Sequence, residues 1–416
     1  MFKLFKNRGI LFLGLSNTIS QLGDRLTHMV IITFIGTITP GRVSAFSEFS
    51  IAFSLPVLIL SPFAGVLVDH WNKRTIMFRC HVIQTILIVL TPTFIRLTHS
   101  ITPIWVLVVL FFCLDVFNNT ARNTVIPDLV EPADLVPANS LIITLARVAT
   151  FLGMVGGGYL IAWTGWSLGF YIDASTHLTA GCFALGMGAK ILFAPVKSFD
   201  LPLKSKLKGA LKLFLGDLRE LGVLLAHDRA VIFVMLSVFV LPFTAAICYT
   251  VIIYLVQQTF GMGTAGIGKF GGIIGIGMLI GGLLMGFLGK KVSRGLIIIV
   301  SIAVLTVFFL IGPFVISPIF LYLVALVSGL VFSLVGIAQD TILQEDVIKG
   351  IRGRIFGTKE FIVNLTFTLS ALAVGLVGNR VAPYTIILIA GIVLLVVTIF
   401  AVYLFLNIPK ELRTKL

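Results

Sequence analysis

The chain of 416 residues is 58% hydrophobic and 12% charged, with a formal net charge of +14. Its mean hydropathy of +1.10 excludes a soluble fold, because a water-soluble surface could not hide this much apolar area. The basic residues are concentrated on one side of the predicted membrane, so the positive net charge does not indicate nucleic-acid binding.

Apolar segments long enough to cross a membrane recur along the whole chain. A helical span needs roughly 20 apolar residues. Twelve segments have this character, at residues 11–36, 43–68, 76–96, 104–121, 138–163, 167–189, 230–257, 266–289, 295–316, 318–340, 355–378 and 381–406. The first follows a basic start and is too long for a signal peptide, so we expect it to be retained. The sequence therefore predicts an all-α integral membrane protein with twelve transmembrane helices.

Two motifs occur twice at nearly the same separation. Residues 65–74 are matched by residues 286–294, and residues 121–127 by residues 338–344. Each copy of the first motif joins two apolar segments through a glycine-bearing turn and a basic cluster. Two matches at almost the same separation indicate a parallel duplication, the layout of a two-bundle transporter.

The duplication predicts two pseudo-symmetric six-helix bundles around a central cavity. The bundles are expected at residues 1–189 and 230–416, with a cytoplasmic linker at residues 190–229. In the linker, Leu207, Leu211 and further apolar residues recur at helical spacing, which predicts an amphipathic helix whose lysines face lipid head groups.

The basic residues predict the orientation of the helices. With both termini on the cytoplasmic side, 25 of the 31 lysines and arginines fall on that side, 4 on the outer side and 2 within spans. This excess is the positive-inside pattern of membrane proteins. We therefore expect both termini to be cytoplasmic and the lipid bilayer to be the main partner.

The loop after the second span combines a carboxylate with basic residues. Gly65 allows two helices to approach closely. Asp69 lies at a helix end, and Lys73 and Arg74 follow it. Asp69 is expected to pair with Arg122 of the fourth span or to meet the positive end of a helix. Such a cluster would latch the cytoplasmic side in one state and open in the other; a loop that only anchors the helices is the alternative.

The first span carries a polar stripe formed by Asn17, Gln21, Asp24 and His28. Steps of four, three and four place these residues on one helical face. Polar groups at mid-bilayer are costly unless they face a cavity or a partner. We therefore predict that the stripe lines the transport path, with Asp24 as the main coupling or substrate-contacting carboxylate. Arg25 belongs to the same candidate region but points roughly 100° away. The alternative is a buried network that only packs helices.

Two more charges lie inside predicted spans. Asp115 in the fourth span and Arg147 in the fifth lie at comparable depth in the cytoplasmic half. Because each charge alone would be expensive in low dielectric, we predict that they form a pair. A structural role and a switching role for this pair both remain open.

The remaining titratable residues within the spans do not point to a transport path or a metal site. Glu48 and Asp173 lie toward the outer ends of their spans and are expected to reach water. His81 and His177 are lone histidines in apolar segments, interpreted as satisfied buried groups. The four cysteines lie in four different spans without a CxxC motif or a nearby histidine set, so no metal or cofactor is expected.

These motifs resemble the major facilitator superfamily. Its G-x-L-x-D-x-x-x-[KR]-[KR] signature is matched at Gly65, Leu67, Asp69, Lys73 and Arg74. The bacterial branch with macrolide-efflux and enterobactin-exporter-like proteins is resembled at Leu22-Gly23-Asp24, at Ala121-Arg122 with Pro127-Asp128-Leu129-Val130, and at Arg352-Gly353-Arg354-Ile355-Phe356-Gly357. The resemblance spans about residues 10 to 400. It implies a transporter of the bacterial inner membrane, with Arg352 and Arg354 in the cytoplasmic gate motif.

Three functions follow from these features. The first is a secondary active exporter of amphipathic small molecules, acting as a monomer and driven by the proton gradient. The second is a dedicated transporter of a lysophospholipid, a siderophore or a metal complex. The third is a non-transporting membrane sensor or scaffold, which the mid-bilayer polar stripe disfavours. No enzymatic activity is expected, because the sequence has no HExxH motif, nucleophile elbow or clustered histidines.

Overall fold

The computed structural model describes residues 7–68, 71–131, 134–187, 229–288, 291–346 and 352–408, together with residues 209, 211, 212, 214–216 and 219. The chain forms two compact units. The first covers residues 1–40, 52–212 and 262–269, and the second covers residues 41–51, 213–261 and 270–416. The linker predicted at 190–229 lies mostly outside the described residues, so its amphipathic helix and its boundaries remain predictions.

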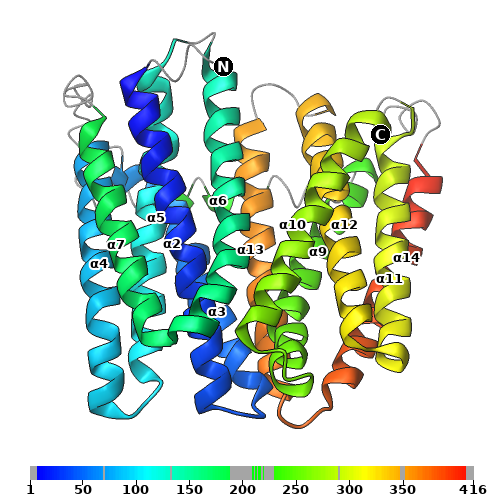
Figure 1. Ribbon diagram of the computed structural model, residues 1–416. Coiled ribbons are helices and arrows are strands. Elements are labelled where there is room, and N and C mark those ends of the chain that lie inside the picture. The colour runs from blue at the N-terminus through cyan, green and yellow to red at the C-terminus, as the bar shows by residue number, and fades with distance from the viewer. Residues whose placement is uncertain are drawn as a thin grey trace. The chain divides into compact units, whose positions relative to one another are not determined.

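The described chain is built of long helices, which confirms the predicted all-α class (Figure 1). In chain order, the helices of the N-terminal half are α2 (Arg8–Ile38), α3 (Val43–Val68), α4 (Lys73–Thr98), α5 (Thr102–Leu129), α6 (Leu135–Thr164) and α7 (Trp166–Gly186). Those of the C-terminal half are α9 (Arg229–Ile247), α10 (Gly263–Leu288), α11 (Arg294–Val315), α12 (Pro318–Asp346), α13 (Arg352–Val377) and α14 (Pro383–Leu406). Two wider π-helical turns, η3 (Cys248–Ile252) and η4 (Leu255–Thr259), follow α9.

Ten of the described helices are long and apolar enough to cross a membrane. The two long helices outside this set are α2 and α7. Both are interrupted by polar residues, Asp24 and Arg25 in α2 and Asp173 and His177 in α7, and these residues lower the hydropathy of their segments. The two helices that depart from the apolar pattern are therefore the ones that carry the buried carboxylates Asp24 and Asp173.

The duplicated loop motif ends in the same way in both halves. Helix α4 begins at Lys73, and the side chain of Asn72 accepts a hydrogen bond from the backbone N–H of Thr75 at 3.1 Å. Helix α11 begins at Arg294, and the Ser293 hydroxyl accepts from the backbone N–H of Leu296 at 3.4 Å. Each side chain satisfies an N–H that the helix itself leaves unpaired. The repeat therefore places an N-cap at equivalent positions.

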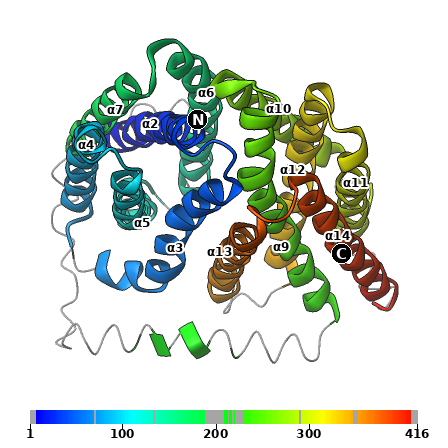
Figure 2. The same ribbon diagram turned by 90° about the horizontal axis from the view of Figure 1, so that it is seen from below.

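Helix α2 is the central element of the first unit. It packs against α6 and α7, while α4 packs against α7 and α5 (Figure 2). Close approach depends on glycines. A Cβ atom at Gly153 would lie 2.8 Å from Cβ of Arg25, and one at Gly157 would lie 2.9 Å from a methyl group of Leu26. These two glycines, four residues apart, therefore allow α6 to lie close against α2.

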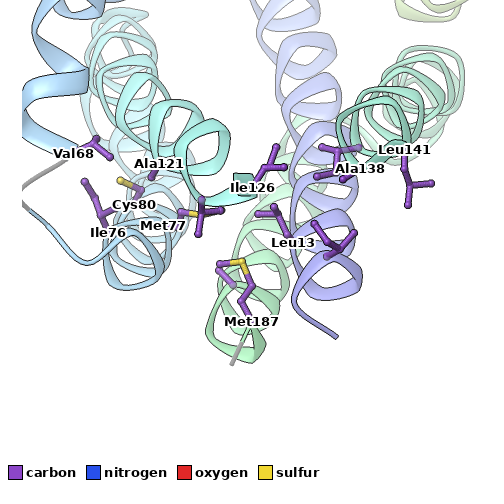
Figure 3. Close-up of a cluster of buried hydrophobic side chains, with 14 residues drawn as sticks. Leu13, Val68, Ile76, Met77, Cys80, Ala121, Ile126, Ala138, Leu141 and Met187 are labelled. Carbon is purple, nitrogen blue, oxygen red and sulfur yellow. The ribbon is translucent and has the colours of Figure 1, made fainter. Parts of the chain in front are cut away.

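On the side of the polar cluster nearer the start of α2, an apolar core joins the six helices α2 to α7 (Figure 3). Its buried members include Leu13 of α2, Met77 of α4, Ile126 of α5, Ala138 of α6 and Met187 after α7. This core holds together the helix ends next to the predicted cytoplasmic gate motif. The polar side chains around Asp24 therefore lie between well-packed helices.

Candidate functional site: a buried polar cluster in the first unit

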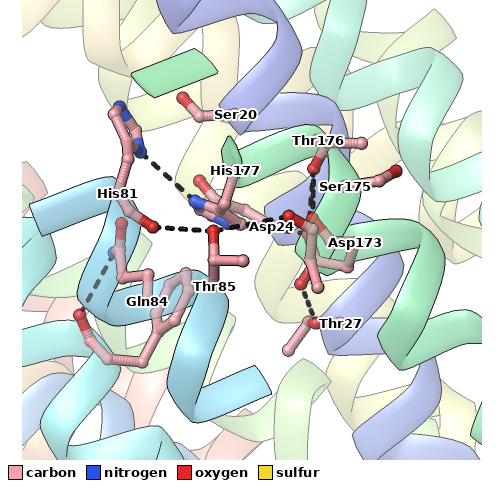
Figure 4. A network of polar contacts seen from close by, with 12 residues as sticks. Ser20, Asp24, Thr27, His81, Gln84, Thr85, Asp173, Ser175, Thr176 and His177 are labelled. Atoms are coloured by element: carbon pink, nitrogen blue, oxygen red, sulfur yellow. Dashed lines mark hydrogen bonds and ion pairs between the residues drawn. The ribbon is translucent and has the colours of Figure 1, made fainter. Parts of the chain in front are cut away.

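Asp24 lies at the centre of a polar cluster inside the first unit (Figure 4). One carboxylate oxygen accepts a hydrogen bond from Nε2 of Gln21 at 3.1 Å. The other lies 3.3 Å from Nε2 of His177 on α7. Asp24 is 8% exposed, so the surrounding protein, and not water, must stabilise its charge.

Helix α7 contributes a carboxylate and an imidazole one turn apart. Nε2 of His177 lies 3.5 Å from Oδ1 of Asp173. The hydroxyl of Thr27 donates to Oδ2 of Asp173, and Thr176 donates to Oδ1 at 3.2 Å. Asp173 is 0% exposed. The prediction that Asp173 reaches water is therefore wrong, because α2 covers this face of α7.

Helix α4 closes the cluster with a second histidine. Nδ1 of His81 lies 3.3 Å from Nδ1 of His177, and both rings are 1% exposed. Next to them, the hydroxyl of Thr85 donates to the backbone carbonyl of His81 at 2.8 Å. The two histidines are buried as predicted, but they contact each other, which the sequence analysis did not anticipate.

Asn17, at the end of the polar stripe nearest the gate motif, contacts α5. Arg122 donates from Nη1 to the side-chain oxygen of Asn17, and from Nε to Asn123 at 3.3 Å. Asp115, one to two turns earlier on α5, accepts from the side-chain amide of Asn119 at 2.7 Å. Both charges interact electrostatically with Asp24, so α2 and α5 share one polar interior.

His28 continues the stripe in the other direction. Its Nδ1 lies 2.9 Å from the backbone carbonyl of Asp24. Its ring makes edge contacts with Phe53 of α3 and Phe112 of α5, with centroid distances of 5.7 and 5.9 Å. The stripe residues thus have protein partners on α3, α5 and α7, and their part in transport remains a prediction. Arg25 faces α6 at Gly153, on a different side from Asp24, as its position on the helix predicted.

The predicted Asp115–Arg147 pair is wrong. Asp115 is bonded to Asn119, whereas Arg147 is exposed on α6, and no ion pair joins these two described residues. The physical reason is the packing order. Helices that are consecutive in sequence need not be packed together, and here α6 packs on α2 while α5 packs on α4.

This correction changes the expected outcome of a double-mutant cycle. We predict that the stability losses of Asp115→Asn and Arg147→Gln add, within about 0.5 kcal/mol, because the two side chains share no partner. The thermal midpoint in detergent of the two single variants and the double variant measures this coupling. A coupling of several kcal/mol would show instead that the charges meet.

The gate motif is described only in part. Asp69 lies outside the described residues, so its predicted contact with Arg122 remains a prediction. Nζ of Lys73 donates to Oδ2 of Asp128 at 2.8 Å and to the backbone carbonyl of Thr124 at 2.9 Å. This partly exposed ion pair ties the start of α4 to α5. Gly65 lies near the end of α3 and Arg74 in the first turn of α4.

The contact between Arg122 of α5 and Asn17 of α2 has a counterpart in the second unit, made by different side chains. Gln339 of α12 aligns with Arg122 in the duplication, and its Nε2 donates to the Ser237 hydroxyl of α9 at 3.1 Å. Next to it, Lys359 of α13 forms an ion pair with Asp340. Each aligned residue therefore joins the fourth helix of its half to the first. Arg352 and Arg354 lie in the first turn of α13, and the orientation of their side chains is outside the description.

Sequence reasoning missed the residues that surround Asp24. Asp173 and His177 are four residues apart, so they share one face of a helix, and this spacing could have marked them as a pair. His81 gave no such signal, because its partner is on another helix.

Comparisons with known proteins agree with this architecture. The family model described as Major Facilitator Superfamily matches residues 13–358. The MFS-type transporter YfiS of Bacillus subtilis (strain 168) is 25% identical over 410 residues, which cover 95% of this chain and 93% of YfiS. Macrolide efflux protein A of Streptococcus pyogenes is 23% identical over 389 residues, 92% of each chain.

A solved structure shows the same fold. The nucleoside transporter NupG superposes with a TM-score of 0.75 at 14% identity, over 95% of this chain and 99% of NupG. At this identity the likeness concerns the fold alone. Because the family model covers most of the sequence, the chain belongs to the major facilitator superfamily and is a multi-pass membrane protein.

Proposed function

We propose that the chain is a secondary active exporter of amphipathic small molecules, working by alternating access and driven by the proton gradient. The observation that carries this proposal is the buried cluster around Asp24. Carboxylates and imidazoles inside an apolar helix bundle are costly, and in membrane proteins they mark ion pathways and proton relays. The similarity to macrolide efflux protein A supports an amphipathic substrate.

The roles proposed for single residues follow from their contacts. Asp24 is the coupling carboxylate, with Gln21 holding one of its oxygens. Asn17 and Arg122 connect the same helix face to α5. The Lys73–Asp128 pair next to the gate motif favours a cytoplasmic latch, because an exposed pair contributes only about 0.2–1 kcal/mol and can open and close easily.

The proposed setting is the bacterial inner membrane. The distribution of basic residues supports cytoplasmic termini, and the protein is proposed to work as a monomer. Alternating access then exposes the first-unit cluster to one side of the membrane at a time.

The test is transport in proteoliposomes. The purified protein is reconstituted and offered a macrolide, a lysophospholipid and a ferric siderophore, with an acidic lumen or with no pH gradient. We expect uptake of at least one amphipathic compound, and faster uptake when protons can leave the lumen. Equal rates with and without the gradient would contradict proton coupling. Transport of the lysophospholipid or the siderophore alone would favour the dedicated transporter instead.

A further inference from the structure

Three ionisable side chains from three helices form one continuous chain of contacts (Figure 4). Oδ1 of Asp24 on α2 lies 3.3 Å from Nε2 of His177 on α7. Nδ1 of His177 lies 3.3 Å from Nδ1 of His81 on α4. Nε2 of His81 is buried, and among the described residues it has no hydrogen bond of good geometry; the same holds for Oδ1 of Asp24 and Nε2 of His177, whose contact is an ion-pair distance. The chain of contacts therefore has a carboxylate at one end and an imidazole nitrogen at the other.

The histidine pair restricts where protons can be. A hydrogen bond between two ring nitrogens requires one N–H and one bare nitrogen. When Asp24 is ionised, its carboxylate can only accept a hydrogen bond. The proton of His177 is therefore on Nε2, the ring nitrogen that faces the carboxylate. A neutral His177 then has a bare Nδ1, so His81 must donate from its own Nδ1. His81 is in the Nδ1–H tautomer in this state.

Adding one proton reverses the donors along the chain. With a proton on Oδ1, Asp24 donates to Nε2 of His177, whose own proton is now on Nδ1. That Nδ1–H donates to Nδ1 of His81, and the proton of His81 is now on Nε2. The cluster gains one proton, no other bond changes, and both rings exchange tautomers. If the added proton stays on His177 as imidazolium, His81 adopts the same Nε2–H tautomer.

We propose that Asp24, His177 and His81 form a single three-residue proton site for the transport cycle, in which the tautomer of His81 changes whenever the site gains or loses a proton. This proposal rests on the proposed proton coupling and extends it from one carboxylate to α4 and α7. In this proposal His177 carries protons, and the tautomer of His81 shows whether the three-residue site holds the added proton.

The neighbouring charges hold this chain in place. On α7, Asp173 accepts from Thr27 and Thr176, so it serves as a fixed acceptor beside Nε2 of His177. On α2, the backbone carbonyl of Asp24 contacts His28. On α5, Asp115 and Arg122 interact electrostatically with Asp24 and have Asn119 and Asn17 as partners. A purely structural network would contain the same contacts but would keep one tautomer.

Nitrogen-15 NMR of histidine side chains separates the two cases without any substrate. The full-length protein, labelled at its six histidines, is placed in lipid nanodiscs and titrated from about pH 5 to about pH 8. The variants His81→Gln and His177→Gln assign the two ring signals. Exposed His99 provides a reference signal in the same spectra.

We expect His81 to change from the Nδ1–H to the Nε2–H tautomer as the pH falls, in step with His177. In Asp24→Asn, the coupled change should be lost while the His99 signal stays as it is in the unmodified protein. One unchanging His81 tautomer in the unmodified protein would overturn the proposal, and so would an unchanged transition in Asp24→Asn. If Asp24→Asn fails to fold, the pH dependence of the assigned His81 signal in the unmodified protein decides the question.

Transport adds a second readout. Gradient-driven uptake by His177→Gln should fall to the level of protein-free liposomes, because glutamine keeps a hydrogen-bonding group but does not gain or lose a proton between about pH 5 and pH 8. Retained gradient-driven uptake in this variant would overturn the proposal. A tautomer change with gradient-independent transport would instead contradict proton coupling and leave the three-residue proton site standing, so the two failures are distinguishable.

Discussion

Replacing Asp24 by asparagine is expected to abolish transport driven by the pH gradient while leaving the protein folded. Asparagine has nearly the same shape, so the contact with Gln21 and the packing of α2 remain. The negative charge facing His177 at 3.3 Å is lost, and an amide cannot take up and release a proton. Uptake of a transported panel compound should therefore no longer respond to the gradient.

The control for this prediction is Glu48→Gln. Glu48 is an exposed carboxylate on α3, paired with Arg42 at 3.4 Å, so its neutralisation should change the stability by about 1 kcal/mol at most and leave transport intact. Thermal midpoints in detergent verify that both variants are folded. Full gradient-driven activity in Asp24→Asn would show that the coupling carboxylate is elsewhere.

Replacing Gly23 by alanine is expected to damage stability and transport together. A Cβ atom at Gly23 would overlap the Thr176 hydroxyl and Oδ1 of Asp173. Neither can move freely, because Asp173 is fully buried and also bonded to Thr27. Inserting a methyl group into such a contact typically costs about 1–3 kcal/mol, and pushing α2 away from α7 separates Asp24 from His177.

Helix α2 itself supplies the matched control, Gly14→Ala. A Cβ atom at Gly14 would lie 3.6 Å from a methyl group of Leu145, an ordinary contact. This substitution should be neutral or stabilising by up to about 1 kcal/mol, because alanine is the better helix former. The thermal midpoints and uptake rates of the two variants measure the difference. Equal midpoints for Gly23→Ala and Gly14→Ala would refute the close α2–α7 contact.

The sequence contained most of the information about the fold. Helix positions followed from apolar length, and the duplicated motifs anticipated the equivalent N-caps of α4 and α11. These features depend on local pattern, which a single sequence displays directly. Ten helices meet the criteria for crossing a membrane, and α2 and α7 fall short because of the polar groups that make them candidates for function.

The site was predictable only along single helices. The stripe from Asn17 to His28 could be inferred because residues three and four apart share a face. Its partners could not, since nothing local reveals that α7, the sixth helix of its half, packs against the first. The Asp115–Arg147 prediction was wrong for this reason: adjacency in sequence was taken for adjacency in space.

The π-helical turns after α9 have a mechanical consequence for the duplication. A π turn holds about one residue more than an α turn, so each insertion rotates the following side chains by roughly 100° around the helix axis. Helix α2 runs for 31 residues without such a turn, whereas its counterpart passes through η3 and η4 between Cys248 and Thr259. Two repeats of common ancestry are therefore out of angular register beyond this point. The first helix keeps one polar face from Asn17 to His28, whereas in the second the π-helical turns change which side chains share a face.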